Sequence, residues 1–364
     1  MFADAFRGRR VLVTGHTGFK GSWLSQWLLD LGAEVHGYSL APNTSPNLFD
    51  ILGLGQRLHS HNVGDVRDAG AVLAVVRTVA PEIVFHLAAQ PLVRLSYQEP
   101  AATWATNVQG TIHLMEAIRS VGGVKACVVV TSDKCYENRE QVWGYREHDS
   151  MGGHDPYSSS KGAAELAVAS WRRSYFKDSA GTKLASGRAG NVIGGGDWSA
   201  DRIVVDFVRA ITSDQPLTLR NPLATRPWQH VLEPLSGYLW LAAQMLRADG
   251  MRHAEGWNFG PADSSVTTVQ DLAERLVAEW GAGRVEAPGN VGQPHEAGLL
   301  KLDVAKAGVL LGWRGIWDVQ RTVLETVHWY KAHHQGAQNL LDRTRSQISA
   351  YSRDAQAARL SWAD

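Results

Sequence analysis

Residues 11–21 read VLVTGHTGFKG, an apolar run followed at once by glycines in a G-x-x-G-x-x-G pattern. The run predicts a buried strand, and the apolar spacing of residues 23–31 predicts a helix directly after it. Glycines suit such a junction because the turn is tight, the backbone must approach a pyrophosphate, and the helix N-terminus supplies amide donors. We therefore predict a dinucleotide-binding loop whose contacts come from Gly15, Thr17, Gly18, Phe19, Lys20 and Gly21.

Other interpretations of the loop concern its ligand. A glycine-rich turn can also serve only to pack a helix on a strand, whereas a phosphate loop of the G-K type is excluded because Lys20 precedes Gly21. In dinucleotide folds an acidic residue ~20 positions further on commonly selects NAD. Here the second predicted strand ends without a carboxylate, so the choice between NAD and NADP stays open and Lys20 is available for a 2′-phosphate. Asp65 and Val66, after the third strand, either reach the adenine or form a solvated turn.

The first half of the chain alternates short β-branched runs with longer amphipathic stretches, which is typical of a parallel sheet with helices on both faces. Strands are predicted over residues 11–14, 35–38, 58–62, 83–86, 124–131 and 184–188, and helices over residues 23–31, 69–79, 106–121 and 157–176. This order predicts an α/β fold with a doubly wound parallel sheet of Rossmann type. Its ligand site should lie at the carboxyl ends of the strands.

The composition of the chain changes after residue 188. Glycines at 194–196 and prolines at 216, 222 and 227 divide it into short elements, with helical patterns at 201–211, 231–247, 269–280 and 319–334. We expect a dinucleotide-binding domain over residues 1–188 and a smaller, loop-rich substrate-binding lobe mainly over 189–350, with room for parts of it to return to the first domain. Residues 351–364 are expected to be a tail, and the polar stretch 335–364 predicts a peripheral or frayed helix.

Composition limits the class of protein. The chain has 364 residues, 44% of them hydrophobic, with 36 basic and 36 acidic side chains. This balance predicts a globular protein without the strong field that binds nucleic acid or an anionic membrane. Two cysteines and the lack of an apolar run of ~18 residues or of a leader-like segment favour a soluble, cytoplasmic protein. His16, His86 and His230 have no metal-ligand spacing, so no metal is expected.

Tyr157 and Lys161 form a Tyr-x-x-x-Lys motif within a predicted helix. At positions i and i+4 the two side chains share one face. A tyrosine with an ordinary pKa of ~10 is a poor base at neutral pH, but a nearby ammonium group favours the phenolate. The motif therefore predicts a catalytic base, with Lys161 also placed to hydrogen-bond the nicotinamide ribose. A surface tyrosine beside a surface lysine is the alternative for the motif taken alone.

Residues 131–138, TSDKCYEN, follow the apolar strand that begins at residue 124. Polar groups that leave a buried strand together at the ligand edge indicate chemistry. Ser132 can orient a hydroxyl group, Asp133 can act as an acid if burial raises its pKa, and Lys134 can carry charge or act as a base if it is desolvated. The alternative is a structural salt bridge between Asp133 and a neighbouring lysine.

Six segments resemble, in order, the extended short-chain dehydrogenase/reductase family of nucleotide-sugar epimerases and dehydratases. The glycine loop and Tyr-x-x-x-Lys are general to the family, whereas TSDKCYEN and RPWQHVLEPL narrow the resemblance to members that act on CDP-hexoses. The segments are TGHTGFKGSWL (14–24), HLAAQPLV (86–93), TSDKCYEN (131–138), DPYSSSKGAAE (155–165), GNVIGGGDW (190–198) and RPWQHVLEPL (226–235).

The resemblance implies a lyase that uses tightly held NAD in an internal redox cycle on CDP-D-glucose. Tyr157 takes the 4-hydroxyl proton as hydride leaves C4, water is lost from C5 and C6, and the hydride returns at C6 to give CDP-4-keto-6-deoxy-D-glucose. Related dehydratases have Thr-Asp-Glu where this chain has Ser132-Asp133-Lys134, so the base at C5 stays open. The resemblance adds Ala88 and Ala89 to the cofactor contacts and implies substrate contacts from Gln90, Arg94, Asn191, Arg202 and Arg226. Asn107 is implied to support the site.

The resemblance further implies a homodimer in which residues 106–121 and 157–176 of each subunit form a four-helix bundle, and a role in deoxysugar biosynthesis for lipopolysaccharide O-antigen. These helices also cover the sheet, so a monomer is the alternative. Rival functions are a nucleotide-sugar 4-epimerase, a dehydratase for another nucleoside-diphosphate hexose, and a non-catalytic dinucleotide sensor. The sensor needs none of Tyr157, Lys161 and Asp133, and their presence argues against it.

Overall fold

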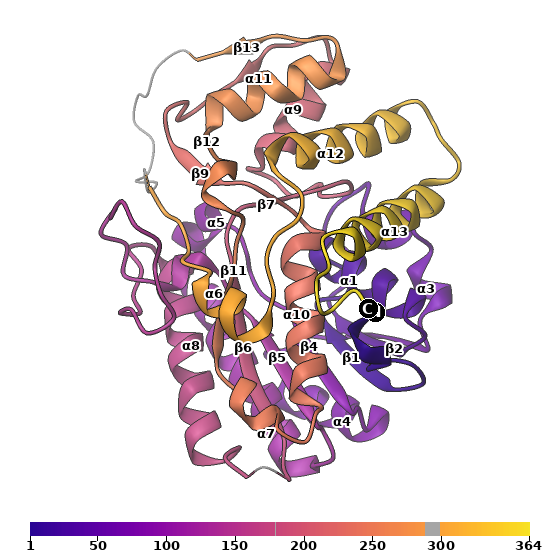
Figure 1. Cartoon of the computed structure of the whole chain (residues 1–364), viewed down its shortest axis with the longest axis vertical. Helices are drawn as coiled ribbons and strands as arrows, with labels where there is room; N and C mark the ends of the chain where they lie inside the picture. Colours follow the sequence, from indigo (N-terminus) through magenta and orange to yellow (C-terminus); the bar gives the residue numbers. More distant parts are fainter. Residues whose placement is uncertain (179, 288–298) are drawn as a thin grey trace.

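A parallel sheet of seven strands, in the order β11-β6-β5-β4-β1-β2-β3, forms the centre of the computed structural model (Figure 1), which describes residues 1–178, 180–287 and 299–364. Residues 288–298, within the expected second lobe, lie outside this description. The strands of the sheet are β1 (Arg10–Thr14), β2 (Glu34–Ser39), β3 (Ser60–Val63), β4 (Ile83–His86), β5 (Ala126–Val130), β6 (Lys183–Ala189) and β11 (Gly256–Phe259).

Alternate residues of each strand enter two separate cores, as the period of two along a strand requires. On β1, Val11 and Val13 pack into the core formed with helices α1 (Phe19–Asp30) and α10 (Leu232–Met245). Leu12 packs into the core on the opposite face, which is formed with α4 (Ala69–Val79), α7 (Gly110–Val121) and α8 (Pro156–Ser174). Because both faces are covered at the centre of the sheet, β4, β5 and the interior of β1 are almost entirely apolar, and polar residues follow at their carboxyl ends.

The smaller lobe lies beyond the carboxyl ends of the strands, at the top of Figure 1. Its short strands pair as β7 with β10, β9 with β12 and β8 with β13. Their bounds are Val192–Ile193, Leu217–Thr218, Thr225–Pro227, Gln229–His230, Val266–Thr268 and Val285–Glu286 for β7, β8, β9, β10, β12 and β13. The remaining helices of the chain are α2 (Leu48–Ile51), α3 (Leu54–Arg57), α5 (Val93–Gln98), α6 (Pro100–Trp104), α9 (Ile203–Thr212), α11 (Val269–Trp280), α12 (Val319–His334) and α13 (Leu340–Ala357).

The six predicted strands are all present, and the doubly wound α/β fold is confirmed. The prediction missed a seventh strand, β11, which pairs with β6 in parallel from Gly256↔Ser186 to Phe259↔Ala189. Its sequence, GWNF, contains a glycine and an asparagine, which are uncommon in strands, and the long-range pairing with β6 defines it as a strand. Strand β11 and helix α10 return the chain from the smaller lobe to the first domain.

The C-terminal segment is not a frayed tail, which corrects the expectation for residues 335–364. Helix α13 buries Leu340, Ile348 and Tyr351 against the main core, and Trp362 beyond it is completely buried. The Trp362 ring stacks on Phe2 with centroids 5.1 Å apart, and the Trp362 carbonyl accepts a hydrogen bond from the Phe2 amide. The two ends of the chain therefore lie side by side and close one side of the core.

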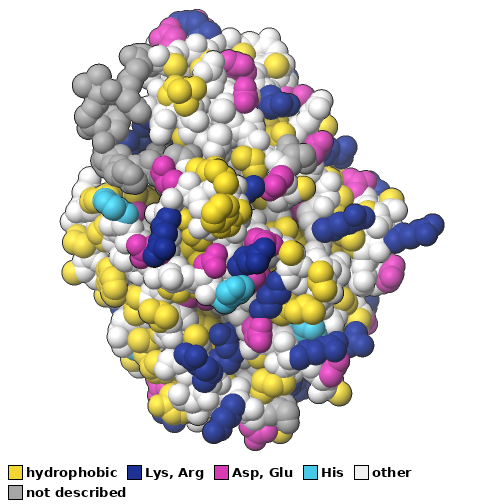
Figure 2. Space-filling model, turned by 60° about the vertical axis from the view of Figure 1, so that its left-hand side comes forward, with side chains coloured by type: hydrophobic (Ala, Val, Ile, Leu, Met, Phe, Trp, Pro, Cys, Tyr) yellow, Lys and Arg dark blue, Asp and Glu magenta, His cyan; other side chains and the backbone are white. Residues whose placement is uncertain are grey.

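The surface matches the charge balance of the sequence. On the face shown in Figure 2, cationic and acidic side chains alternate over the surface, so that neither sign gathers into one field there. Among the described helices, none combines the length and the apolar character that a bilayer span requires.

Glu233 joins helix α10 to the C-terminal segment. Its buried carboxylate accepts hydrogen bonds from the backbone amides of Ile316 and Trp317, at 3.1 and 2.7 Å, and from the Tyr351 hydroxyl at 2.7 Å. Burial raises the pKa of Glu233 to about 7, against the opposing effect of these hydrogen bonds. The folded protein therefore binds a proton here that the unfolded chain releases at lower pH.

This proton makes the free energy of unfolding depend on pH. Because the pKa of Glu233 is higher in the folded than in the unfolded state, stability should fall as pH rises from about 4.5 to 7, by about 3 kcal/mol from this group. Urea unfolding of the wild type and of Glu233→Gln at pH 5, 6, 7 and 8 measures this, with exposed Glu274→Gln as the control. The Glu233→Gln slope should be flatter, and parallel slopes would contradict the assignment.

Candidate functional site

A cavity of about 760 Å³ lies at the carboxyl ends of the strands, between the sheet and the smaller lobe. Its walls come from the loops after β1 to β6, from the start of α8, and from α9 and β8 of the smaller lobe. The cavity therefore lies where the order of strands in a doubly wound sheet predicts a ligand. It contains eight cationic and five acidic side chains, although the whole chain has no net charge, and this local excess suits a ligand that carries phosphates.

The glycine loop brings bare backbone to the cavity. A Cβ on Gly15, whose φ is +74°, would lie 2.7 Å from the Ala88 amide nitrogen, and a Cβ on Gly21 would lie 2.1 Å from the Gly15 carbonyl oxygen. Neither position has room for a side chain. Gly18 is the N-cap of α1, so the first free amides of that helix point toward the cavity end of the loop. These features fit a pyrophosphate and therefore fit a dinucleotide.

The other predicted cofactor residues also line the cavity. The Thr17 hydroxyl shares a 2.9 Å hydrogen bond with the hydroxyl of Ser39, which closes the loop onto the end of β2. Asp65 binds Arg67 at 2.6 Å, and this ion pair lowers the pKa of Asp65. The Asp65 carboxylate is therefore engaged by its own turn. The cavity lining also contains Gly15, Gly18, Phe19, Lys20, Gly21, Val66, Ala88 and Ala89.

Lys20 lies close to the reactive end of the cavity. Burial and the positive charge of Arg202 lower its pKa to about 8, while Asp133 acts in the opposite direction. The sequence left Lys20 available to bind a 2′-phosphate. In the structure the charged groups near Lys20 include Asp133 and Lys161, and the end of β2 contributes none of them. The structure thus gives Lys20 no role in selecting NADP, because a residue can read a 2′-phosphate only where the adenine ribose lies.

Tyr157, Ser132 and Asp133 lie together inside the cavity. Tyr157 is 7% exposed and hydrogen-bonds Ser132 through its phenol group. The Ser132 hydroxyl donates to Asp133 Oδ1 at 2.9 Å, while Asp133 Oδ2 is buried with no hydrogen-bond partner among the described residues. An unpartnered buried carboxylate oxygen is costly, and Asp133 is one of the residues that line the cavity.

The electrostatics of Tyr157 differ from the sequence expectation that Lys161 lowers its pKa. Burial raises the pKa of Tyr157 to about 12, and the hydrogen bond with Ser132 and the charge of Arg202 only partly oppose this. Burial likewise lowers the pKa of Lys161 to about 8. Desolvation is the largest cause of both shifts, so the site favours a neutral phenol.

Glu165, which the sequence analysis did not select, anchors the catalytic helix. Its buried carboxylate accepts hydrogen bonds from Thr131 and Ser186 and forms an ion pair with Arg188 at 2.7 Å. Glu165 lies one turn after Lys161 on α8 and raises the pKa of that lysine against the effect of burial. The spacing of residues 157, 161 and 165 on one helix face was the signal that could have identified it.

Helix α8 is also held from its other side. The Asn107 side chain donates to the Ser160 hydroxyl at 2.9 Å and accepts from the Gln90 amide at 2.8 Å, as expected of a supporting residue. The contact of Gln90 with the substrate stays a prediction. Its side-chain amide donates to the Leu92 carbonyl at 3.0 Å and to the Thr103 hydroxyl on α6 at 2.9 Å.

The predicted substrate side of the cavity contains Arg94, Asn191, Arg202 and Arg226. Arg94 pairs with Asp201 at 3.7 Å, and Arg202 lies 3.9 Å from Asp197. These pairs are long, so a phosphate can compete for the guanidinium groups. Arg226 is 4% exposed, and its guanidinium group donates a hydrogen bond to the Thr225 carbonyl at 2.8 Å.

Arg220 was missed by the sequence analysis. It lines the same side of the cavity and is held by two carboxylates at 2.8 Å, those of Asp201 and Asp206. No motif surrounds Arg220 in the sequence, so only the fold could place it there. The pairing fixes the orientation of α9, which contributes the wall opposite the glycine loop.

Comparison with known proteins places this geometry among sugar-nucleotide enzymes. Residues 12–326 match the family described as GDP-mannose 4,6 dehydratase. CDP-glucose 4,6-dehydratase of Salmonella typhimurium is 50% identical over 95% of this chain and 97% of its own length. The crystal structure of a dTDP-glucose 4,6-dehydratase from Streptomyces venezuelae with NAD bound has a TM-score of 0.76, with 25% identity over 91% of this chain and 99% of that one. UDP-glucose 4-epimerase of Thermotoga maritima shares the fold at a TM-score of 0.76, with 24% identity over 89% of this chain and 99% of that one.

The contact between Gly15 and Ala88 can be tested by substitution. Gly15→Ala should raise the dissociation constant of NAD⁺ at least about tenfold, because the new Cβ would displace the Ala88 backbone from the cavity wall. Gly122→Ala is the matched control, since Gly122 has φ +72° but no atom within 4 Å of its Cβ position. Calorimetric titration of both variants measures the effect. If Gly15→Ala bound NAD⁺ as tightly as Gly122→Ala does, the contact between Gly15 and Ala88 would not be needed for NAD⁺ binding.

Proposed function

The chain belongs to the GDP-mannose 4,6 dehydratase family, within the extended short-chain dehydrogenases/reductases, and on this premise we propose that it is an NAD-dependent CDP-glucose 4,6-dehydratase. The reaction converts CDP-D-glucose into CDP-4-keto-6-deoxy-D-glucose. The observation that carries the proposal is the 50% identity, over nearly the full length of both chains, with a CDP-glucose 4,6-dehydratase. The cavity supports it, because one wall suits a dinucleotide and the other suits a diphosphate.

The glycine loop, Ala88, Ala89 and Lys161 are the groups that would hold NAD. When bound, NAD⁺ supplies the acceptor that takes hydride from C4 of the hexose and gives it back at C6. The cavity lies at the N-terminus of α1, whose amides and dipole favour the pyrophosphate. Neutral Asn191 and the arginines of the smaller lobe are left for the diphosphate of the substrate.

Tyr157 accepts the proton of the 4-hydroxyl group. Because burial raises its pKa to about 12, the phenol needs the positive charges of its surroundings to lose its own proton. The Ser132 hydroxyl can donate its hydrogen bond either to Asp133 or to the phenolate of Tyr157. It can therefore stabilise the negative charge when that charge is on Tyr157. Lys161, with a pKa lowered to about 8, can deliver the compensating charge.

Asp133 acts as the acid at C6. Its Oδ1 is held by Ser132, which leaves Oδ2 to carry the proton to the departing 6-hydroxyl group. A carbonyl at C4 makes the C5 proton acidic, and we assign its removal to Lys134, which lines the cavity two residues after Ser132. The Lys134 amide donates to the Ser132 hydroxyl at 3.3 Å, so the short turn fixes the acid and the base relative to each other.

We further propose a cytoplasmic homodimer that supplies deoxysugars for O-antigen. Both cysteines are buried thiols without a disulfide, which suits a reducing compartment. Leu166 on α8 is 60% exposed, and Trp104 on the neighbouring helix α6 is 41% exposed, so this helical surface carries apolar groups that a second copy would cover. Sedimentation of the wild type and of Leu166→Glu distinguishes dimer from monomer.

A panel of substrates tests the proposed activity. Purified protein with NAD⁺ should convert CDP-D-glucose into a product lighter by one water molecule, as measured by mass spectrometry. CDP-glucose should be turned over faster than dTDP-, GDP- and UDP-hexoses. A product of unchanged mass but inverted configuration at C4 would identify a 4-epimerase instead. Faster turnover of a hexose linked to another nucleotide would support the dehydratase reaction but contradict CDP-D-glucose as the substrate.

Tyr157→Phe is the catalytic control for this panel. It should lower kcat by at least about a hundredfold without weakening NAD⁺ binding, since it removes only the proton acceptor. Tyr175→Phe, an exposed tyrosine just after α8, is the matched variant and should keep full activity. Unchanged turnover in Tyr157→Phe would remove the central residue from both the dehydratase and the epimerase schemes.

Lys134→Met tests the base. We expect wild-type enzyme in deuterated water to place deuterium at C5 of the product, and the variant to lose at least about 90% of the rate of this exchange. The variant should still oxidise C4. The absorbance of the reduced nicotinamide in a single turnover measures this step. Undiminished exchange would show that another group takes the C5 proton.

A further inference from the structure

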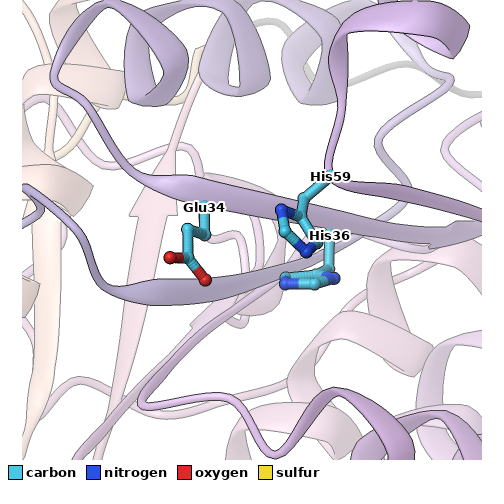
Figure 3. Close-up of side chains that lie close together, drawn as sticks. All are labelled: Glu34, His36 and His59. Carbon is cyan, nitrogen blue, oxygen red and sulfur yellow. The ribbon is translucent and has the colours of Figure 1, made fainter.

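A second cluster of ligating side chains lies at the opposite end of the sheet from the cavity. Glu34 is the first residue of β2, and His36, two residues later, extends from the same face of the strand. His59 directly precedes β3, whose first residue, Ser60, pairs with His36. Figure 3 shows the three side chains gathered at this edge of the sheet. The cavity lies at the carboxyl ends of the strands, whereas this cluster lies at the amino end of β2.

The three residues offer ligand atoms that lie close enough to share one ion. One atom from each, a carboxylate oxygen of Glu34 and a ring nitrogen of each histidine, lies within 4.8 Å of the other two. The imidazole rings of His36 and His59 have centroids 4.7 Å apart. Two histidines and one carboxylate are a ligand set that binds Zn²⁺ with an open fourth position for water.

The two ring nitrogens of His36 supply an independent observation that points to a ligand. Its side chain is 6% exposed, and Nδ1 is hydrogen-bonded to the Ser60 hydroxyl at 2.8 Å. Nε2 is buried without a hydrogen-bond partner among the described residues. Leaving a buried ring nitrogen unpaired costs free energy. A histidine that binds a metal through one nitrogen commonly holds a hydrogen bond through the other, and this is the arrangement found here.

The charges around the cluster also suit a cation. Glu34 supplies one negative charge. Arg10 is the nearby cation that opposes metal binding, but its guanidinium is turned to the Ala80 carbonyl, to which it donates at 2.9 Å.

We propose that Glu34, His36 and His59 bind one Zn²⁺ ion. In a tetrahedral centre with bonds of about 2.0–2.1 Å the ligand atoms are about 3.3 Å apart, so the exposed Glu34 and His59 side chains move inward around the fixed His36 ring. The ion joins the start of β2 to the residue before the edge strand β3. It thereby stabilises the pairing of β2 with the edge strand β3, whose carboxyl ends contribute to the dinucleotide wall, and it does not take part in the proposed reaction.

Zinc titration of the untagged, chelator-treated full-length chain tests the site. We expect one equivalent to bind, measured by competition with a chromophoric chelator, and the dissociation constant to rise at least about tenfold in His59→Ala and in Glu34→Gln, each of which removes one ligand. His148→Ala, which removes an exposed histidine outside the cluster, is the matched control and should bind like the wild type. Zinc should also raise the melting temperature of the wild type.

Two results would overturn the proposal. One is that the wild type binds no zinc equivalent, and the other is that His59→Ala and the wild type have equal affinity. Cobalt provides a second readout, because a tetrahedral centre gives intense visible absorption that should be present in the wild type and His148→Ala and lost in His59→Ala. Circular dichroism of the variants verifies folding, and both substituted groups are exposed, so the core is untouched.

Discussion

The ion pair between Glu165 and Arg188 fixes the geometry on which the active site depends. Both side chains are almost completely buried, at 3% and 5% exposure, and the carboxylate also receives the hydroxyl groups of Thr131 and Ser186. Desolvation makes such a pair a weak source of stability, but its directional contacts fix register. Arg188 lies on β6 and Thr131 directly follows β5, so Glu165 joins α8, which carries Tyr157, to the ends of both strands and holds it beside the proposed acid and base.

Desolvation is the largest influence on the pKa values of Tyr157, Lys20 and Lys161. Burial raises the pKa of Tyr157 to about 12 and lowers the pKa values of Lys20 and Lys161 to about 8. Each shift favours the neutral form. A dinucleotide and a diphosphate bring their own charges into the same cavity, so ligand binding changes the balance that controls proton transfer. The excess of cationic side chains in the wall compensates for the phosphates.

The two ends of the parallel sheet carry different sites, the cavity at the carboxyl end and the proposed metal cluster at the amino end. All strands run in one direction, so polar residues that follow them meet at the carboxyl edge, where the cavity lies. At the amino end of β2, the pairing of His36 with Ser60 brings His59 beside it, on an edge strand that no further strand covers within the described sheet. Such an edge gains from a cross-link that does not depend on backbone hydrogen bonds.

The sequence by itself determined the local chemistry: the glycine loop, the helical spacing of Tyr157 and Lys161, and the polar residues that follow β5, because each depends on neighbours within a few positions. The tertiary structure alone decided the features that depend on distant pairing. These are strand β11, the burial of the C-terminal segment through Trp362 and Phe2, and the hydrogen bond that ties Gln90 to Thr103 on α6. It also decided the direction of the Tyr157 pKa, because desolvation is a property of everything that surrounds a group and not of the residues next to it in the chain.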